Sequence, residues 1–140
     1  VLPLVAGLFV LVEGLDRVGA IAALNALVHE AIVHSVAAAA WGSAAVVAVA
    51  CNLMNNLPVG LIAGSVTASN PLPPQVTGTA LIAVDLGPNL SVTGSLATIL
   101  WLIALHREGV AISAWRFLGL GLLVMPPALI LAVGAMMLRS

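Results

Sequence analysis

The sequence predicts an all-α integral membrane protein with a re-entrant helical hairpin and a broken transmembrane helix. Hydrophobic residues make up 62% of its 140 residues and charged residues only 6%, whereas soluble domains carry about 25% charged residues. Two clusters of polar, glycine and proline residues interrupt long apolar runs. Backbone without helical hydrogen bonds survives at membrane depth only inside protein or beside a water-filled cavity. Each interruption therefore predicts a segment that packs inside the protein or lines a cavity.

Charge and cysteine content exclude several classes of function. The net charge is −1 with four basic residues, which argues against nucleic acid as a partner. The single cysteine, Cys51, allows no internal disulfide and no thiolate-only metal site. No catalytic Ser/His, paired Asp or His-x-x-x-His arrangement falls at membrane depth, so we expect neither an enzyme nor a cofactor. The chain starts in an apolar run without a basic leader, and we expect it to be part of a longer protein.

The first 35 residues predict the end of one membrane helix and a second helix along the surface. Residues 1–16 are an apolar run with charges at its end, which are expected at an interface. Residues 18–35 predict an interfacial amphipathic helix. Two of its histidines are five residues apart, which turns them apart on a helix and disfavours a metal site; a proton relay is the remaining alternative. The residues expected on its wetted polar face are Asn25, His29, Glu30 and His34.

Residues 38–67 predict a re-entrant hairpin with its tip near residues 55–58. Three asparagines and a proline fall in the middle of this otherwise apolar segment, where unsatisfied amides are costly. Pro58 suits the first turn of the second arm, and Asn56 is expected either to be the N-cap of that arm or to offer its amide to a substrate. The alternative is one kinked span whose asparagines bond to neighbouring helices.

Residues 76–106 predict a transmembrane helix that is unwound near residues 86–94. The run is too long for one straight span, and it contains a Gly-Pro pair and a second glycine. Ser95 is the expected N-cap of the helix that follows. Asp85 is the only acid in this apolar territory, and it is a candidate for proton coupling because burying its charge is expensive. The alternative is a structural acid bonded to backbone at the helix break.

The last helix is expected over residues 115–138, with a kink at Met125-Pro126-Pro127. Arg107 and Arg116 flank the preceding loop and predict that it faces the cytoplasm. Two interruptions that both end near mid-membrane are typical of the substrate site of a secondary transporter. No Arg or Lys lies near either, which favours a small neutral solute over a carboxylate. Cys51 as a thiol ligand is less favoured than Cys51 as a packing residue.

Two motifs resemble a known family. Cys-Asn-Leu-Met-Asn-Asn-Leu-Pro (residues 51–58) and Asp-Leu-Gly-Pro-Asn-Leu-Ser-Val-Thr-Gly-Ser-Leu-Ala-Thr-Ile-Leu-Trp (residues 85–101) resemble the arsenical pump membrane protein family. These are the arsenite and antimonite efflux carriers of the ion transporter superfamily. Val-Met-Pro-Pro-Ala-Leu (residues 124–129) is similar to the last helix of that family. The resemblance covers nearly the whole chain, which corresponds to the C-terminal half of the longer family protein.

The resemblance implies one half of an inverted-repeat secondary transporter. Such a carrier is a multi-pass protein of the inner (plasma) membrane that exports arsenite or antimonite as the neutral hydroxide, by antiport with protons. The implied partners are the N-terminal half of the same transporter, membrane lipid and, optionally, a soluble arsenite-stimulated ATPase. The residues that fall on the family's site motifs, and are expected to line the substrate, are Asn55, Asn56, Asn89, Ser91, Thr93 and Ser95.

Two alternatives stay open. The first is a related carrier of the same superfamily for another small solute or anion, such as silicic acid or a carboxylate. The second is a non-transporting membrane scaffold subunit, which predicts unbroken helices through both interruptions.

Overall fold

The structure is a computed structural model that describes residues 2–139. Within that range it is all-helical, with two short 3-10 helices between longer α-helices. The elements in chain order are α1 (Leu2–Arg17), α2 (Ala20–His34), α3 (Val36–Met54), α4 (Asn56–Ser69), α5 (Pro74–Leu86), η1 (Gly87–Leu90), η2 (Val92–Gly94), α6 (Leu96–Arg107) and α7 (Ala114–Leu138).

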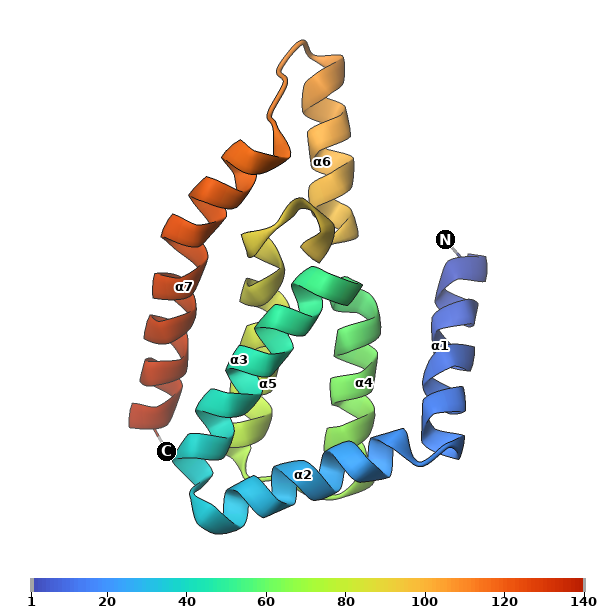
Figure 1. Ribbon diagram of the computed structural model, residues 1–140, viewed down its shortest axis with the longest axis vertical. Helices are drawn as coiled ribbons and strands as arrows, with labels where there is room; N and C mark the ends of the chain where they lie inside the picture. Colours follow the sequence, from blue (N-terminus) through green and yellow to red (C-terminus); the bar gives the residue numbers. More distant parts are fainter. Residues whose placement is uncertain (1, 140) are drawn as a thin grey trace.

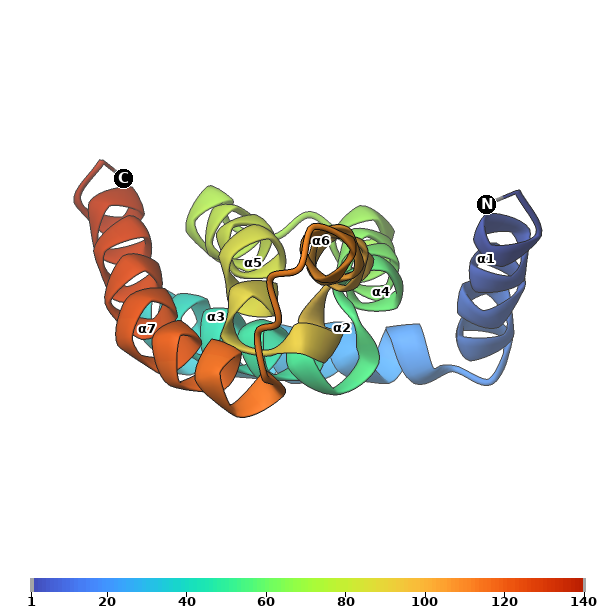
Figure 2. The same cartoon turned by 90° about the horizontal axis from the view of Figure 1, so that it is seen from above.

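The helices are arranged around a hairpin formed by α3 and α4. Helix α2 lies across the open end of this hairpin, and α5 runs beside α3 (Figure 1). The chain then passes through η1 and η2 at the closed end of the hairpin, and α6 continues beyond it (Figure 1). Helices α1 and α7 stand at opposite ends of the molecule (Figure 2). Both interruptions therefore lie at one end of the α3–α4 hairpin, and η1 packs against α7 (Figure 1).

Serine side chains cap the first turns of three helices: Ser35 that of α3, Ser95 that of α6 and Ser113 that of α7. Ser35 Oγ accepts a hydrogen bond from Ala38 N at the start of α3, at 3.2 Å. Ser95 does the same for α6, where Ala97 N donates to its Oγ over 3.2 Å, as the sequence predicted. Such caps satisfy one of the backbone donors that have no partner in the first turn.

Helices α3 and α5 pack along a stripe of small side chains. The buried residues recur every three or four positions on each helix, which places them on one face. Small residues let two helix backbones approach closely where lipid gives no hydrophobic driving force. Thr79 is fully buried at this contact, and its hydroxyl donates to the carbonyl oxygen of Ala40 at 3.1 Å. The buried residues of the stripe are Ala40, Ala44, Ala48 and Cys51 on α3 and Val76, Ala80 and Ala83 on α5.

The polar face expected on the helix over residues 18–35 is partly packed against protein. Asn25 is buried, and its amide donates to the carbonyl oxygen of Val66 on α4 at 2.9 Å. His29, one turn further on, has its Nε2 atom enclosed. The prediction that these two residues face water is therefore wrong, because α2 turns this side toward the hairpin. Glu30 and His34 are exposed.

Two helices in the described range, α3 and α7, are long and apolar enough to cross a membrane. With 25 residues, α7 is about 38 Å long at 1.5 Å per residue, against about 30 Å for the hydrocarbon core. Pro126 and Pro127 lie inside α7 and remove two backbone donors, and Figure 1 shows the helix curving along its length. Many large apolar side chains are exposed around the molecule, as expected of a chain that faces lipid or further protein.

Glycine at position 121 lets α7 approach η1, in the interruption between α5 and α6. A Cβ atom there would collide with the carbonyl oxygen of Leu90 and lie 2.9 Å from that of Asn89. We expect Gly121→Ala to lower the free energy of unfolding by about 1–3 kcal/mol, because backbone must shift to make room. Gly119→Ala is the matched control on the same helix, since nothing lies within 4 Å of its added Cβ. Thermal unfolding in detergent measures both; equal midpoints for the two variants would contradict this packing.

Candidate functional site

A single amide joins the two interruptions. Asn52, in the last turn of α3, donates through Nδ2 to the carbonyl oxygens of Ala48 at 2.8 Å and Gly87 at 2.7 Å. Its Oδ1 accepts from the backbone N–H of Ser91 at 2.9 Å and from the Ser91 hydroxyl at 2.7 Å. The partners at Gly87 and Ser91 are backbone groups of the segment between α5 and α6. The Asn52 side chain therefore takes the place of helical hydrogen bonds that this segment lacks.

Two further bonds extend the connection to the hairpin tip. The Thr93 hydroxyl donates to the carbonyl oxygen of Asn52 at 3.0 Å, and Asn55 Nδ2 donates to the carbonyl oxygen of Thr93 at 3.3 Å. The Ser91 and Thr93 hydroxyl oxygens lie 3.2 Å apart. We call Asn52, Asn55, Ser91 and Thr93 the Asn52 network. It is a compact group of amides and hydroxyls with no charged member.

Asn55 forms the hairpin tip in a backbone conformation that is rare for any residue with a side chain. Its φ is 77° and its ψ is 151°. Of the residues 2–139 that the structure describes, it is the one non-glycine residue whose φ is positive. This region of φ/ψ space is used almost only by glycine and costs about 1–3 kcal/mol. The Asn55 side chain offsets part of that cost by accepting from Leu57 N at 3.3 Å, which caps α4. The prediction of Asn56 as the N-cap is therefore wrong by one residue.

Two glycines make the close approach around the network sterically feasible. A Cβ atom on Gly87 would lie 2.6 Å from the Cα of Ala48, where α5 ends against α3. A Cβ atom on Gly94 would collide with the carbonyl group of Pro88. The two 3-10 helices consequently fold tightly against each other and against the end of α3.

The structure brings together only some of the residues expected to line a substrate. Asn55, Ser91 and Thr93 belong to the network, and Ser95 follows it as the cap of α6. Asn89 is exposed, and its amide bonds locally to the carbonyl oxygens of Asp85 and Leu86 at 3.3 and 3.1 Å. Asn56 is partly buried, and its side chain makes no hydrogen bond within the described part of the chain.

Asp85 lies apart from the network. Ala83 and Gly87 face α3, and Asp85 is two residues from each, on the opposite side of α5 at about 100° per residue. It is exposed, and within residues 2–139 its carboxylate makes no hydrogen bond or ion pair. The candidate proton carrier therefore lies on the face of α5 away from α3, whereas the hydroxyl cluster lies beyond the end of α5 and is bonded to α3.

The sequence prediction missed Asn52, the centre of the network. Its signal was an amide in the last turn of an apolar helix, three residues before the tip. A buried helix cannot leave such an amide unbonded. Its partners, however, are 35 and 39 residues away in the chain, so the position alone does not identify them.

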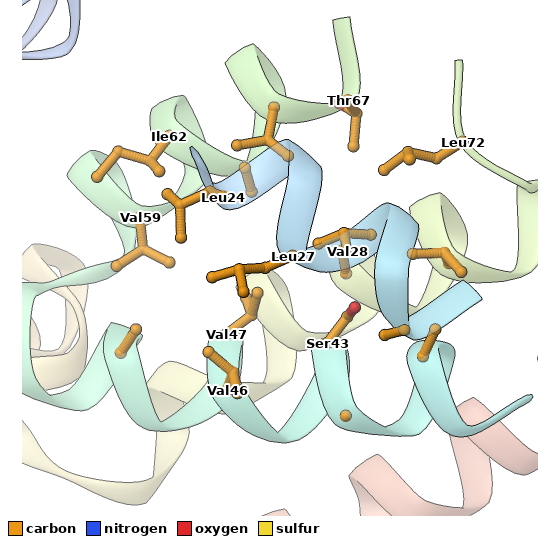
Figure 3. A pocket seen from close by; sticks show the side chains of 18 of the residues that line it. Leu24, Leu27, Val28, Ser43, Val46, Val47, Val59, Ile62, Thr67 and Leu72 are labelled. Carbon is orange, nitrogen blue, oxygen red and sulfur yellow. The ribbon is translucent and has the colours of Figure 1, made fainter. Parts of the chain in front are cut away.

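An apolar cavity lies elsewhere in the molecule. It has a volume of about 500 Å³ and is lined by residues of α2, α3, α4 and α5 (Figure 3). Among its labelled lining residues, Leu24, Val46 and Ile62 are apolar, and Ser43 and Thr67 supply the few hydroxyls. A hydrated solute needs convergent polar groups to fix its orientation. The candidate site is therefore the Asn52 network and not this cavity.

Comparison with known proteins identifies the family. The family model for the arsenical pump membrane protein matches residues 1–138. The chain belongs to this family. The arsenical pump membrane proteins of Yersinia enterocolitica and of Escherichia coli strain K12 are each 30% identical to it over 138 residues. This family consists of membrane pumps and not of enzymes, as the sequence predicted.

The chain spans about a third of its curated relatives. The matches to the Yersinia enterocolitica and Escherichia coli K12 proteins cover 95% of this chain but 32% of each relative. No solved structure matches the chain. The arsenical pump family thus accounts for almost every residue here, while most of the relative's length has no counterpart in the chain.

Substitutions at Asn55 test the tip. We expect Asn55→Gly to be more stable than Asn55→Ala by about 1 kcal/mol or more, because glycine removes the backbone strain and alanine keeps it. Both variants lose the cap to α4 and the bond to Thr93. Unfolding midpoints in detergent give the comparison. An alanine variant as stable as the glycine variant would show that the tip does not hold this conformation.

Proposed function

We propose that this chain is the C-terminal part of a secondary transporter that exports arsenite or antimonite in exchange for protons. The observation that carries the proposal is the meeting of two helix interruptions in one uncharged hydrogen-bonded network. Unwound backbone at membrane depth is the usual setting of a carrier's substrate site. Membership of the arsenical pump family supports the choice of substrate. The proposed location is the inner membrane, with the N-terminal part of the same carrier as partner and a soluble ATPase as an optional one.

The lengths of the elements support a re-entrant hairpin and a broken helix. Helix α4 has 14 residues and is about 21 Å long, which is too short to cross about 30 Å of hydrocarbon. Helices α5 and α6 have 13 and 12 residues, so each is shorter still. Only α5 and α6 together, joined through η1 and η2, reach across. Helix α3 is long enough to cross the bilayer, so on this reading it is the short arm α4 that keeps the hairpin tip, and with it the break, inside the bilayer.

The chemistry of the network favours a neutral solute with hydroxyl groups. Between residues 86 and 105 there is no Asp, Glu, Lys or Arg, and the same holds for residues 31–84. An anionic carboxylate at this depth needs a cation or several donors to offset its lost hydration. A neutral hydroxide of trivalent arsenic or antimony can exchange hydrogen bonds with amides and hydroxyls alone. The proposed contacts of the solute are Asn55, Ser91 and Thr93. The side chains proposed to lie at the edge of the substrate site are Ser95, Asn56 and Asn89.

Proton coupling is assigned to Asp85. It is the only ionisable carboxyl group between Ala31 and His106, and such groups within a membrane are by default functional candidates. Since Asp85 lies on the face of α5 away from α3, it does not compete directly with the solute for the same ligands. Protonation would instead act through the end of α5, where Asn89 is bonded to the Asp85 carbonyl oxygen.

Asp85→Asn tests the coupling. We expect pH-driven arsenite movement in everted vesicles to fall by at least about tenfold, since an amide cannot carry the proton. Downhill exchange of labelled arsenite, without a pH gradient, should persist. Asp16→Asn, at the exposed end of α1, is the control and should transport like the wild type. If Asp85→Asn keeps full pH-driven transport, the coupling assignment is wrong.

Substrate competition tests the class of solute. We expect arsenite and antimonite to compete with each other for uptake into everted vesicles, and citrate to compete with neither. Carboxylate uptake without metalloid uptake, or silicic acid uptake alone, would favour the related carrier. Absence of any transport by the full-length gene product, with normal membrane insertion, would favour a scaffold subunit.

A further inference from the structure

We propose that Asn52 is a positioning residue: its amide oxygen takes the hydroxyl hydrogen of Ser91 and its backbone carbonyl takes that of Thr93, so that both hydroxyl oxygens present acceptors to the solute. The inference rests on the proposed function for the identity of the solute. The hydrogen bonds that carry it are properties of the fold and do not depend on transport.

Asn52 has no capacity left for a ligand. An asparagine amide offers two N–H donors and two acceptor lone pairs. Both donors go to carbonyl oxygens, those of Ala48 and Gly87, and both lone pairs receive donors from Ser91. The orientation of the amide is unambiguous, because a flipped amide would set its oxygen against the two carbonyl oxygens. Contact with a solute would break one of these bonds, so Asn52 holds the site and does not bind.

The hydroxyl hydrogens of Ser91 and Thr93 are both donated to Asn52. Ser91 donates its single hydroxyl hydrogen to Asn52 Oδ1, and Thr93 donates its own to the Asn52 carbonyl oxygen. Their oxygens are 3.2 Å apart, and neither has a hydrogen left for the other unless a bond to Asn52 is given up. The pair therefore faces a bound molecule with lone pairs. A hydroxyl group that donates into this pair is favoured, and a carboxylate, which only accepts, is not.

Few ionisable groups surround this arrangement. The segments in contact with the end of α3, namely η1, η2 and α4, contain none. Cys51 is the ionisable residue of α3 itself, Asp85 that of α5 and Arg116 that of α7. None of them is hydrogen-bonded to Asn52 in the described chain. An acid introduced at position 52 would thus report its own protonation.

Asn52→Asp is the decisive variant. Its carboxylate form has no donor and places a negative charge against the Ala48 and Gly87 carbonyl oxygens, whereas its protonated form restores one donor and still accepts from Ser91. Arsenite transport by the variant is divided by that of the wild type at each pH. Near pH 8 this ratio should be about 0.1 or less, and it should rise toward 1 as the pH falls toward about 5.5. The change should reverse in the same vesicles, which excludes misfolding. Asn52→Ala, which lacks a donor at every pH, should be low throughout.

Asn25→Asp is the matched control, because Asn25 also donates its amide to a backbone carbonyl but lies on α2, outside the site. Its transport ratio should not vary with pH. An Asn52→Asp ratio that is flat over this range, or one matched by Asn25→Asp, would overturn the inference.

A second measurement needs no transport. Hydrogen exchange at the Ser91 amide, in detergent at one fixed pH, should be about tenfold faster in Asn52→Ala than in the wild type and unchanged in Asn25→Ala. Faster exchange in a protein that moves no metalloid would keep the role of Asn52 and reject the proposed function. Unchanged exchange would reject the role itself.

Discussion

The bonds between Asn52 and the segment after α5 are the interaction on which the rest of this structure depends. A helix that stops at Leu86 and resumes at Leu96 leaves backbone groups without helical partners, and in the proposed membrane setting no water would replace them. Asn52 satisfies two of these groups, the Gly87 carbonyl and the Ser91 N–H. One side chain therefore stabilises an interruption that belongs to another helix, and it ties the positions of the two interruptions together.

Small side chains bring these groups within reach. The alanine stripe on α3 meets Ala80 and Ala83 on α5, and Gly87 continues that face to the end of the helix. A larger residue along the stripe would separate the backbones and lengthen the 2.7 Å bond from Asn52 to Gly87. Gly121 allows α7 to close over the opposite side of η1. Packing and hydrogen bonding thus support each other at the end of α5.

The candidate site was only partly predictable from the sequence. Both interruptions follow from proline, glycine and polar residues inside apolar runs, and serine at position 95 is an N-cap wherever a helix starts there. The role of each asparagine was not predictable. Asn52 enters the network while Asn89 bonds to its own helix end, and Asn25 packs against α4 instead of facing water. These outcomes depend on the rotational phase at which helices meet, which no local pattern encodes.

By itself the sequence determined the membrane class and the places where the helices break, because these depend on composition and on backbone donors that are local to each segment. The family followed from the resemblance of its motifs. Only the tertiary structure decided which polar groups share a site. Asn52 and Ser91 are 39 residues apart, and they meet because α3 and α5 pack in one register along their small-residue faces. The same register turns Asp85 to the other side of α5. The separation of the acid from the hydroxyl cluster is thus a property of helix packing and not of sequence order.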